Sequence, residues 1–226
     1  MEDRGEAWPE DSGQEGQVKY KAVFFDFDGT IMDTSIGIFA GGRYAMEKLG
    51  LPIDEEHTVW RSFIGPPIGD CFRITFGVKD DSLVDELVRQ YRVYYEAEGR
   101  FKAVFYPGIV DVLRALKARG YKLAVASMKN EDLVVEMCEH FGIADLFDEM
   151  LGLDLAGEAT KESLLRKGFE RLGLEPCECV LVGDTQIDSD GAKAAGCDCI
   201  KVDWGFGFTK GQTGTIGSAQ RILDLV

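Results

Sequence analysis

From residue 107 to residue 202, short apolar runs alternate with longer segments whose apolar residues recur at helical spacing. The runs have the length of strands, and several of the segments between them end at a glycine, as helices commonly do. Strands that alternate with helices normally lie parallel in one sheet, because each helix carries the chain back across it. We therefore predict an α/β fold with a Rossmann-like, mostly parallel sheet and helices on both faces.

The expected elements follow the positions of these runs. Strands are expected over residues 21–26, 122–126, 149–153, 179–182 and 198–202. Helices are expected over residues 35–49, 81–95, 109–118, 131–140, 161–172, 188–195 and 218–226. Residues 19–33 and 107–226 then form a catalytic core, and residues 34–106 form a helical insert after the first strand, which we interpret as a cap. Residues 1–18 hold six acids and one base with few apolar residues, which predicts a disordered acidic tail.

Charge and composition exclude several classes of partner. The net charge is −15, which disfavours binding to nucleic acid or to an anionic membrane. No apolar run reaches the roughly 18 residues of a membrane span, and the N-terminal segment does not resemble a signal peptide. Six cysteines in such a chain suggest reduced thiols and a cytoplasmic protein. We expect a monomer or a homodimer.

Two Cys-x-Cys pairs, at 177–179 and 197–199, lack the spacing typical of zinc ligands. Cys179 and Cys199 fall on expected strands, which favours core positions for them. The Trp204–Phe208 segment contains two glycines, but no helix follows at the spacing of a dinucleotide fingerprint. We expect it to form a loop at the mouth of the ligand-binding site.

Polar side chains follow the expected strands at the points where they end. Asp26 and Asp28 follow the first strand, Ser127 follows the strand at 122–126, and Asp184 follows the strand at 179–182. Lys161 opens a helix, and Asp188 lies four residues after Asp184. Ligands of open α/β sheets bind beyond the carboxyl ends of the strands, so we expect these groups to share one site.

This set of groups suits a phosphate monoester. An aspartate can attack phosphorus to form an aspartyl-phosphate, and a second carboxylate can move the proton. Clustered carboxylates repel one another and a dianionic substrate, so a hard cation, Mg²⁺, is expected among them. Lys161 and Ser127 can hold the phosphoryl oxygens, and Gly29 allows the backbone to approach them closely.

The motif Asp26-Phe27-Asp28-Gly29-Thr30, with Ser127, Lys161 and Gly183-Asp184 followed by Asp188, resembles the four motifs of the haloacid dehalogenase-like hydrolases. The resemblance implies that Asp26 is the nucleophile and Asp28 the general acid/base. It implies a Mg²⁺ site made by Asp26, Asp28 through its carbonyl, and Asp184, which Asp188 supports directly or through water or Lys161. The groups expected to bind phosphate are Gly29, Thr30, Ser127, Met128 and Lys161.

The segments Phe63–Pro67 and Tyr106–Gly108 resemble the phosphoglycolate-phosphatase-like branch, which carries a helical cap. Within the insert, Arg61 lies just before the punctuated Gly65-Pro66 turn, so we predict that Arg61, Gly65 and Pro66 contact substrate. Two stretches depart from the usual pattern of the family. Ser127-Met128-Lys129 stands where Thr-Asn-Lys is common, and the approach to Lys161 over residues 157–160 is unusual.

Asp28 favours phosphate transfer over dehalogenation, because dehalogenases of this family lack the second carboxylate. The predicted function is hydrolysis of a small phosphorylated metabolite such as phosphoglycolate, a sugar phosphate or a nucleotide. Two alternatives remain open: a phosphomutase with the same motifs, or a non-hydrolytic phosphoacceptor like a receiver domain. The cap-sized insert and Asp28 would have no task in a phosphoacceptor.

Overall fold

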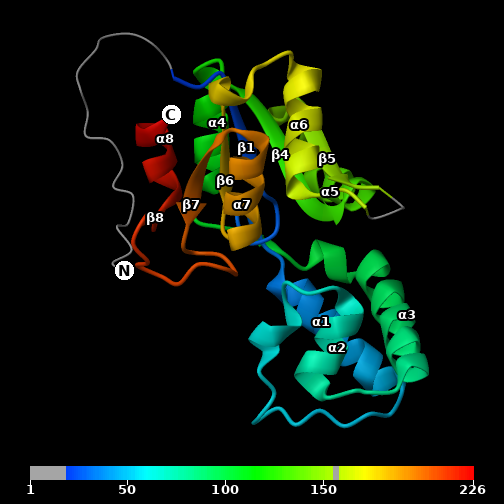
Figure 1. Ribbon diagram of the computed structural model, residues 1–226. Coiled ribbons are helices and arrows are strands. Elements are labelled where there is room, and N and C mark those ends of the chain that lie inside the picture. The colour runs from blue at the N-terminus through cyan, green and yellow to red at the C-terminus, as the bar shows by residue number, and fades with distance from the viewer. Residues whose placement is uncertain (1–18, 155–157) are drawn as a thin grey trace. The chain divides into compact units, whose positions relative to one another are not determined.

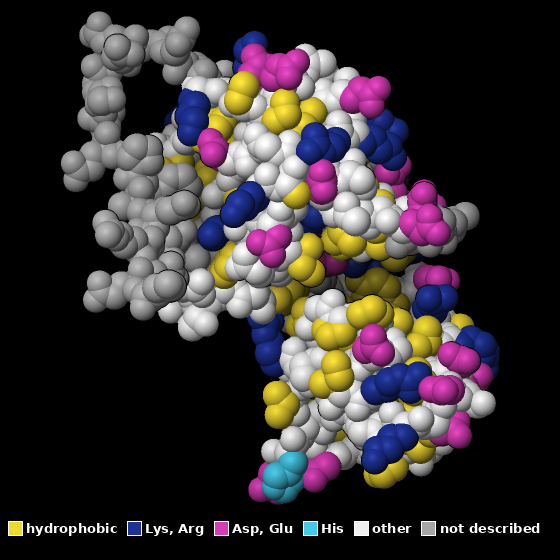
Figure 2. Space-filling model, in the orientation of Figure 1, with side chains coloured by type: hydrophobic (Ala, Val, Ile, Leu, Met, Phe, Trp, Pro, Cys, Tyr) yellow, Lys and Arg dark blue, Asp and Glu magenta, His cyan; other side chains and the backbone are white. Residues whose placement is uncertain are grey.

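A computed structural model describes residues 19–154 and 158–226. The expected acidic tail and Gly157 lie outside the described residues. The chain divides into two compact units: residues up to Met32 together with Phe105–Val226, and Asp33–Val104 (Figure 1). No described helix is both long and apolar enough to span a bilayer. On the face in Figure 2, acidic and basic side chains are interspersed.

The first unit contains a six-stranded sheet in the order β5-β4-β1-β6-β7-β8, and every pair of neighbours is parallel. The strands are β1 (Ala22–Phe25), β4 (Lys122–Asn130), β5 (Glu149–Leu153), β6 (Cys179–Gly183), β7 (Asp198–Val202) and β8 (Thr215–Ile216). The predicted parallel α/β sheet is confirmed. In the central register, Phe25 lies beside both Val125 and Val182, so the three strands reach their carboxyl edge together.

Five helices accompany this sheet within the described residues: α4 (Ile109–Ala118), α5 (Glu131–His140), α6 (Lys161–Leu172), α7 (Gln186–Ala195) and α8 (Ile222–Leu225). The predicted N-cap of α5, Asn130, accepts the Leu133 N–H with its side chain. The predicted glycine after α6, Gly173, has φ 66° and ends that helix. The helix expected over 188–195 begins two residues earlier, at Gln186, because Thr185 is its N-cap.

The core of this unit lies on both faces of the sheet, since alternate strand residues point to opposite faces. On one face, the Phe24 ring meets Phe169 of α6 edge-on, with ring centroids 5.2 Å apart. Cys179 and Cys197 belong to the same buried cluster, and Cys199 packs against it. Cys179 and Cys199 therefore pack in the core, as their places on expected strands predicted, and Cys197 joins them. Val23 and Phe25 are equally buried on the opposite side.

The second unit is helical, with α1 (Ser35–Lys48), α2 (Ile68–Phe76) and α3 (Asp81–Ala97), and with two 3₁₀ turns at Trp60–Phe63 and Gly99–Phe101. Its core is aromatic, with Phe63 and Phe72 packed edge to face at 5.0 Å. Two glycines let α1 approach aromatic rings closely. An added Cβ would lie 2.8 Å from the Tyr91 ring at Gly41 and 2.8 Å from the Phe63 ring at Gly42. The chain passes between the units through a two-stranded sheet of β2 (Met32–Asp33) and β3 (Val104–Phe105). That the second unit acts as a cap stays a prediction.

Candidate active site

The catalytic candidates converge because their strands are parallel neighbours. Asp26 follows β1 directly, and its N–H donates to Val182 O of β6 at 2.9 Å. Asp184 follows β6 directly. The position of Ser127 differs from the prediction: β4 does not end before it but continues to Asn130, with an irregular register between Ala126 and Asn130. This irregular stretch still brings Ser127 to the same edge of the sheet.

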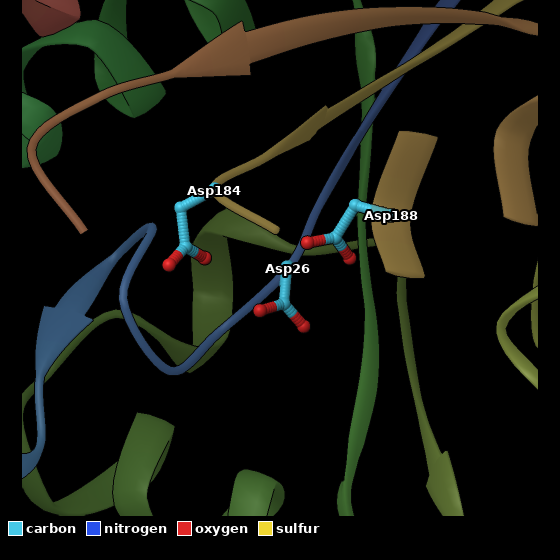
Figure 3. Close-up of side chains that lie close together, drawn as sticks. All are labelled: Asp26, Asp184 and Asp188. Carbon is cyan, nitrogen blue, oxygen red and sulfur yellow. The ribbon is translucent and has the colours of Figure 1, made fainter. Parts of the chain in front are cut away.

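Three buried carboxylates form the centre of the site. One oxygen from each of Asp26, Asp184 and Asp188 lies within 4.8 Å of the others. In Figure 3 the Asp26 side chain lies between the other two, at the ends of different elements. Burial raises the pKa of Asp184 to about 6. Burial also raises the pKa of Asp26 above its usual range, because the neighbouring carboxylates add to that effect while Lys161 opposes it.

Lys161 is the cation of this cluster. Its Nζ lies 2.7 Å from Asp26 Oδ1, 2.6 Å from the carbonyl oxygen of Ala126 and 2.8 Å from Asp188 Oδ1. Burial alone would lower the pKa of Lys161, but the carboxylates of Asp26 and Asp188 outweigh it and raise the pKa. Lys161 is held at the start of α6, where Thr160 and Ser163 form a capping box. The ammonium group therefore stays charged and fixes one oxygen of Asp26.

Asp188 has two structural tasks at once. Its Oδ2 accepts the N–H of Thr185 at 3.0 Å and the Thr185 hydroxyl at 2.6 Å, which completes the capping box of α7. Its Oδ1 pairs with Lys161. Gly183 permits this approach, since a Cβ there would lie 2.4 Å from the Asp188 Cβ. Asp188 is thus locked in place before any ligand binds.

The turn after Asp26 is closed by its own backbone hydrogen bonds. Gly29 N–H donates to Met32 O at 2.8 Å and Thr30 N–H to Phe27 O at 3.4 Å. That Gly29 and Thr30 bind phosphate stays a prediction. Thr30 also contributes its hydroxyl, which donates to Asp184 Oδ1 at 2.9 Å. Gly29, at φ 87°, leaves room for Asp184, whose Oδ2 would lie 2.3 Å from an added Cβ.

The Trp204–Phe208 loop also supports Asp184. The Phe206 N–H donates to Asp184 Oδ2 at 2.5 Å, and the Phe208 N–H donates to Asp184 O at 2.9 Å. The Trp204 indole donates to the Thr30 carbonyl at 3.2 Å. Both oxygens of Asp184 are therefore oriented by neighbouring donors, which the sequence did not indicate beyond placing this loop near the site.

Asp28 lies at the edge of the cluster beside a lysine that the sequence reasoning did not single out. Lys129 Nζ is 3.3 Å from Asp28 Oδ1 and 3.2 Å from Oδ2. Met128, between Ser127 and Lys129, is exposed. The pairing joins residues 101 positions apart, so only the register of β1 and β4 could have indicated it.

The predicted substrate contacts belong to the second unit. Arg61 lies on the 3₁₀ turn Trp60–Phe63, and Gly65, with φ 111°, and Pro66 are exposed just after it. Their role in binding substrate stays a prediction.

The donor set fits a divalent cation. Oxygen ligands on converging carboxylates are those that Mg²⁺ and similar hard cations prefer. The raised pKa values of Asp26 and Asp184 reflect carboxylates packed together out of water, and a bound cation relieves that repulsion. Asp26, Asp184 and Asp188 are the side chains that could hold it.

Comparison with known proteins identifies the family. The sequence profile of the haloacid dehalogenase-like hydrolases matches residues 23–202. The chain belongs to this family. A 5'-nucleotidase of Pseudomonas aeruginosa is 35% identical over 86% of this chain and 87% of its own length. A phosphoglycolate phosphatase of Neisseria meningitidis is 34% identical over 83% of this chain and 82% of its own length. The resemblance inferred from the motifs is confirmed.

Solved structures of haloacid dehalogenase-like proteins share the fold. The structure of protein tyrosine kinase A from Mycobacterium tuberculosis matches with a TM-score of 0.76 at 29% identity, over 92% of this chain and 99% of that one. The names of these relatives cover a nucleotidase, a phosphatase and a kinase. Membership of this family makes the chain an enzyme of the hydrolase class. It does not identify the substrate, because one fold can serve many substrates.

Proposed function

We propose that this chain is a Mg²⁺-dependent phosphatase that hydrolyses a small phosphate monoester through an aspartyl-phosphate on Asp26. The observation that supports this proposal most strongly is the environment of the Asp26 side chain. It is buried between two further carboxylates, and one of its oxygens is fixed by Lys161 at 2.7 Å. A carboxylate that is fixed in this way suits in-line attack on phosphorus.

In the first half-reaction, the Asp26 carboxylate attacks phosphorus and the bond between phosphorus and the ester oxygen breaks. Asp28 gives its proton to the departing oxygen, so an alcohol leaves. In the second half-reaction, Asp28 takes a proton from water as the water attacks the same phosphorus. The bond between phosphorus and Asp26 then breaks, which restores the Asp26 carboxylate and releases inorganic phosphate.

The remaining groups hold the phosphoryl oxygens. Ser127 and Lys161 are proposed to contact them, together with the backbone at Met128. A bound Mg²⁺ held by Asp26, Asp184 and the Asp28 carbonyl supplies charge neutralisation for the phosphoryl oxygens. Thr30 orients Asp184 through its hydroxyl, and Asp188 holds Lys161, which in turn contacts Asp26.

The names of the relatives support a small phosphorylated metabolite as substrate. A panel of nucleoside monophosphates, phosphoglycolate and sugar phosphates, assayed for phosphate release with Mg²⁺ and again with EDTA, tests the proposal. We expect Mg²⁺-dependent release from at least one member of the panel. Stable phosphorylation without release would indicate a phosphoacceptor, and an isomerised phosphate ester would indicate a mutase.

A further inference from the structure

A second buried ammonium group lies at the carboxyl edge of the sheet. The Lys129 side chain is 8% exposed, and its Nζ is within 3.3 Å of both oxygens of Asp28. A long cationic side chain is rarely this buried unless it is paired. Asp28 is more open, with 27% of its side chain exposed, so a ligand can reach it.

Lys161, the other buried lysine of the site, is paired with Asp26. The three close neighbours of Lys161 Nζ are Asp26 Oδ1, Ala126 O and Asp188 Oδ1, all within 2.8 Å. The two lysines therefore divide the two candidate carboxylates between them, Lys161 with Asp26 and Lys129 with Asp28.

The backbone around Lys129 is rigid enough to give its side chain a fixed origin. The Lys129 N–H donates to Ser127 Oγ at 3.2 Å, and the next residue, Asn130, caps α5. On the neighbouring strand, Gly152 packs so closely that an added Cβ would lie 2.6 Å from Lys129 O. Contacts within β4, and with α5 and β5, thus hold this short stretch of β4 in place.

We propose that Lys129 is a positioning residue for Asp28, which holds that carboxyl group in the orientation from which it gives its proton to the leaving group. The inference rests on the proposed phosphatase function. Orientation matters because proton transfer requires the donor to lie within hydrogen-bond reach of the departing oxygen. A free Asp28 side chain would populate other rotamers and lose part of its effect.

The dependence of kcat/KM on the leaving group tests this role. For a reaction through a phospho-enzyme, kcat/KM reports the steps up to departure of the leaving group. Asp28→Asn should lose about 10²–10⁴-fold with alkyl phosphates and much less with p-nitrophenyl phosphate, whose leaving group needs little protonation. Lys129→Met should show the same pattern at about 10–10²-fold, and Lys129→Arg should recover part of the loss. Lys193→Met, at an exposed position on α7, is the matched control.

A uniform loss across all esters in Lys129→Met would overturn the inference, since it would assign Lys129 to the phosphoryl group or to the fold. Thermal melting checks folding, and Lys129→Gln carries the same test if Lys129→Met does not fold. In a double-mutant cycle, Lys129→Met should add almost nothing in the Asp28→Asn background, because its partner is gone. Additive losses would contradict the proposal. If the unmodified chain hydrolyses none of the esters, the proposed function itself fails, which is a separate outcome.

Discussion

At the scale of single residues, the proposed chemistry depends on Asp26. This residue follows β1 directly, and Lys161 fixes one of its oxygens. Its neighbour Asp184 accepts hydrogen bonds from Thr30 and Phe206. Its other neighbour, Asp188, accepts one from the Thr185 hydroxyl. The cluster is therefore built before substrate arrives.

We predict that Asp26→Asn abolishes turnover, because an amide is a poor nucleophile. The folded state should survive, since Lys161 keeps its ion pair with Asp188 and one source of repulsion among the carboxylates is removed. Steady-state assays and thermal melting measure the two effects. Asp190→Asn, at an exposed position on α7, is the control and should retain activity. Turnover near the unmodified level in Asp26→Asn would rule out a covalent aspartate.

At the scale of elements, the Trp204–Phe208 loop is bound to the site by close backbone contact. A Cβ on Gly205 would lie 2.1 Å from Gly29 O and 2.4 Å from Asp184 Oδ2. We predict that Gly205→Ala displaces Asp184 and weakens Mg²⁺ binding by about 10–100-fold, the usual effect of disturbing the support of a metal ligand. Calorimetric titration with Mg²⁺ measures it. Gly217→Ala is the control, because its added Cβ meets nothing closer than 3.5 Å. Equal Mg²⁺ affinity in the two variants would disprove the supporting role of the loop.

Asp148 ties the start of β5 to its neighbours. Its carboxylate, 19% exposed, accepts the Leu123 N–H at 3.0 Å and lies within 3.0 Å of Lys117 and Lys122. Burial would raise the pKa of Asp148, but the Leu123 hydrogen bond and the two lysines outweigh it and lower the pKa to about 2. The stabilising effect is thus present above the unfolded pKa, near 4, and disappears as the pH falls towards 2.

We predict that Asp148→Asn lowers the free energy of unfolding by about 1–2 kcal/mol at pH 7 and that the difference shrinks as the pH falls from about 4 to 2. Urea unfolding at several pH values measures it. The exposed Asp145→Asn provides the control for removing a nearby charge. A difference that stays constant down to pH 2 would show that Asp148 acts by packing rather than by charge.

The elements themselves were largely predictable from the sequence. The bounds of α4, α5, α6, β5 and β7 agree with those expected from apolar spacing, capping residues and terminal glycines. The start of α7 was wrong because Thr185 and Asp188 form a reciprocal capping box, which moves the cap three residues upstream of Asp188. The length of β4 was wrong because pairing with β5 resumes at Asn130 beyond an irregular stretch.

The site was predictable only where one residue follows one strand. Asp26 and Asp184 converge because parallel strands end at the same edge, and the sequence indicates both strands. The pairing of Lys129 with Asp28 depends on the register between distant strands and on the irregular course of β4. The partner of the Gly29 N–H depends on a local feature, because the turn bends back so that this N–H donates to Met32 O. Short sequence patterns carry neither kind of information.

At the scale of the whole molecule, the chain separates into a unit that holds the carboxylate cluster and a helical unit, Asp33–Val104. The groups proposed to hold the phosphoryl oxygens are all in the first unit. They are indifferent to the alcohol part of the ester, so we expect selectivity to come from the helical unit. The exposed Arg61 and the exposed Gly65-Pro66 turn are the candidates.

We predict that Arg61→Ala or Pro66→Ala lowers kcat/KM for the best metabolite in the panel at least about tenfold more than for p-nitrophenyl phosphate, because only the metabolite offers the contacts that would be lost. Arg92→Ala, at an exposed position on α3 in the same unit, controls for loss of a surface charge. Parallel losses on both substrates would assign this turn to the fold of the helical unit, and the source of selectivity would lie elsewhere.

The central claim is that phosphate passes through a covalent bond to Asp26. Rapid quenching during turnover of a labelled phosphate ester with Mg²⁺, followed by borohydride reduction and peptide mass spectrometry, tests it most directly. We expect the reduced, formerly phosphorylated residue at position 26 and none in the Asp26→Asn variant. Turnover with no phospho-enzyme captured on the fastest time points, or a phosphoryl group on another residue, would contradict the account.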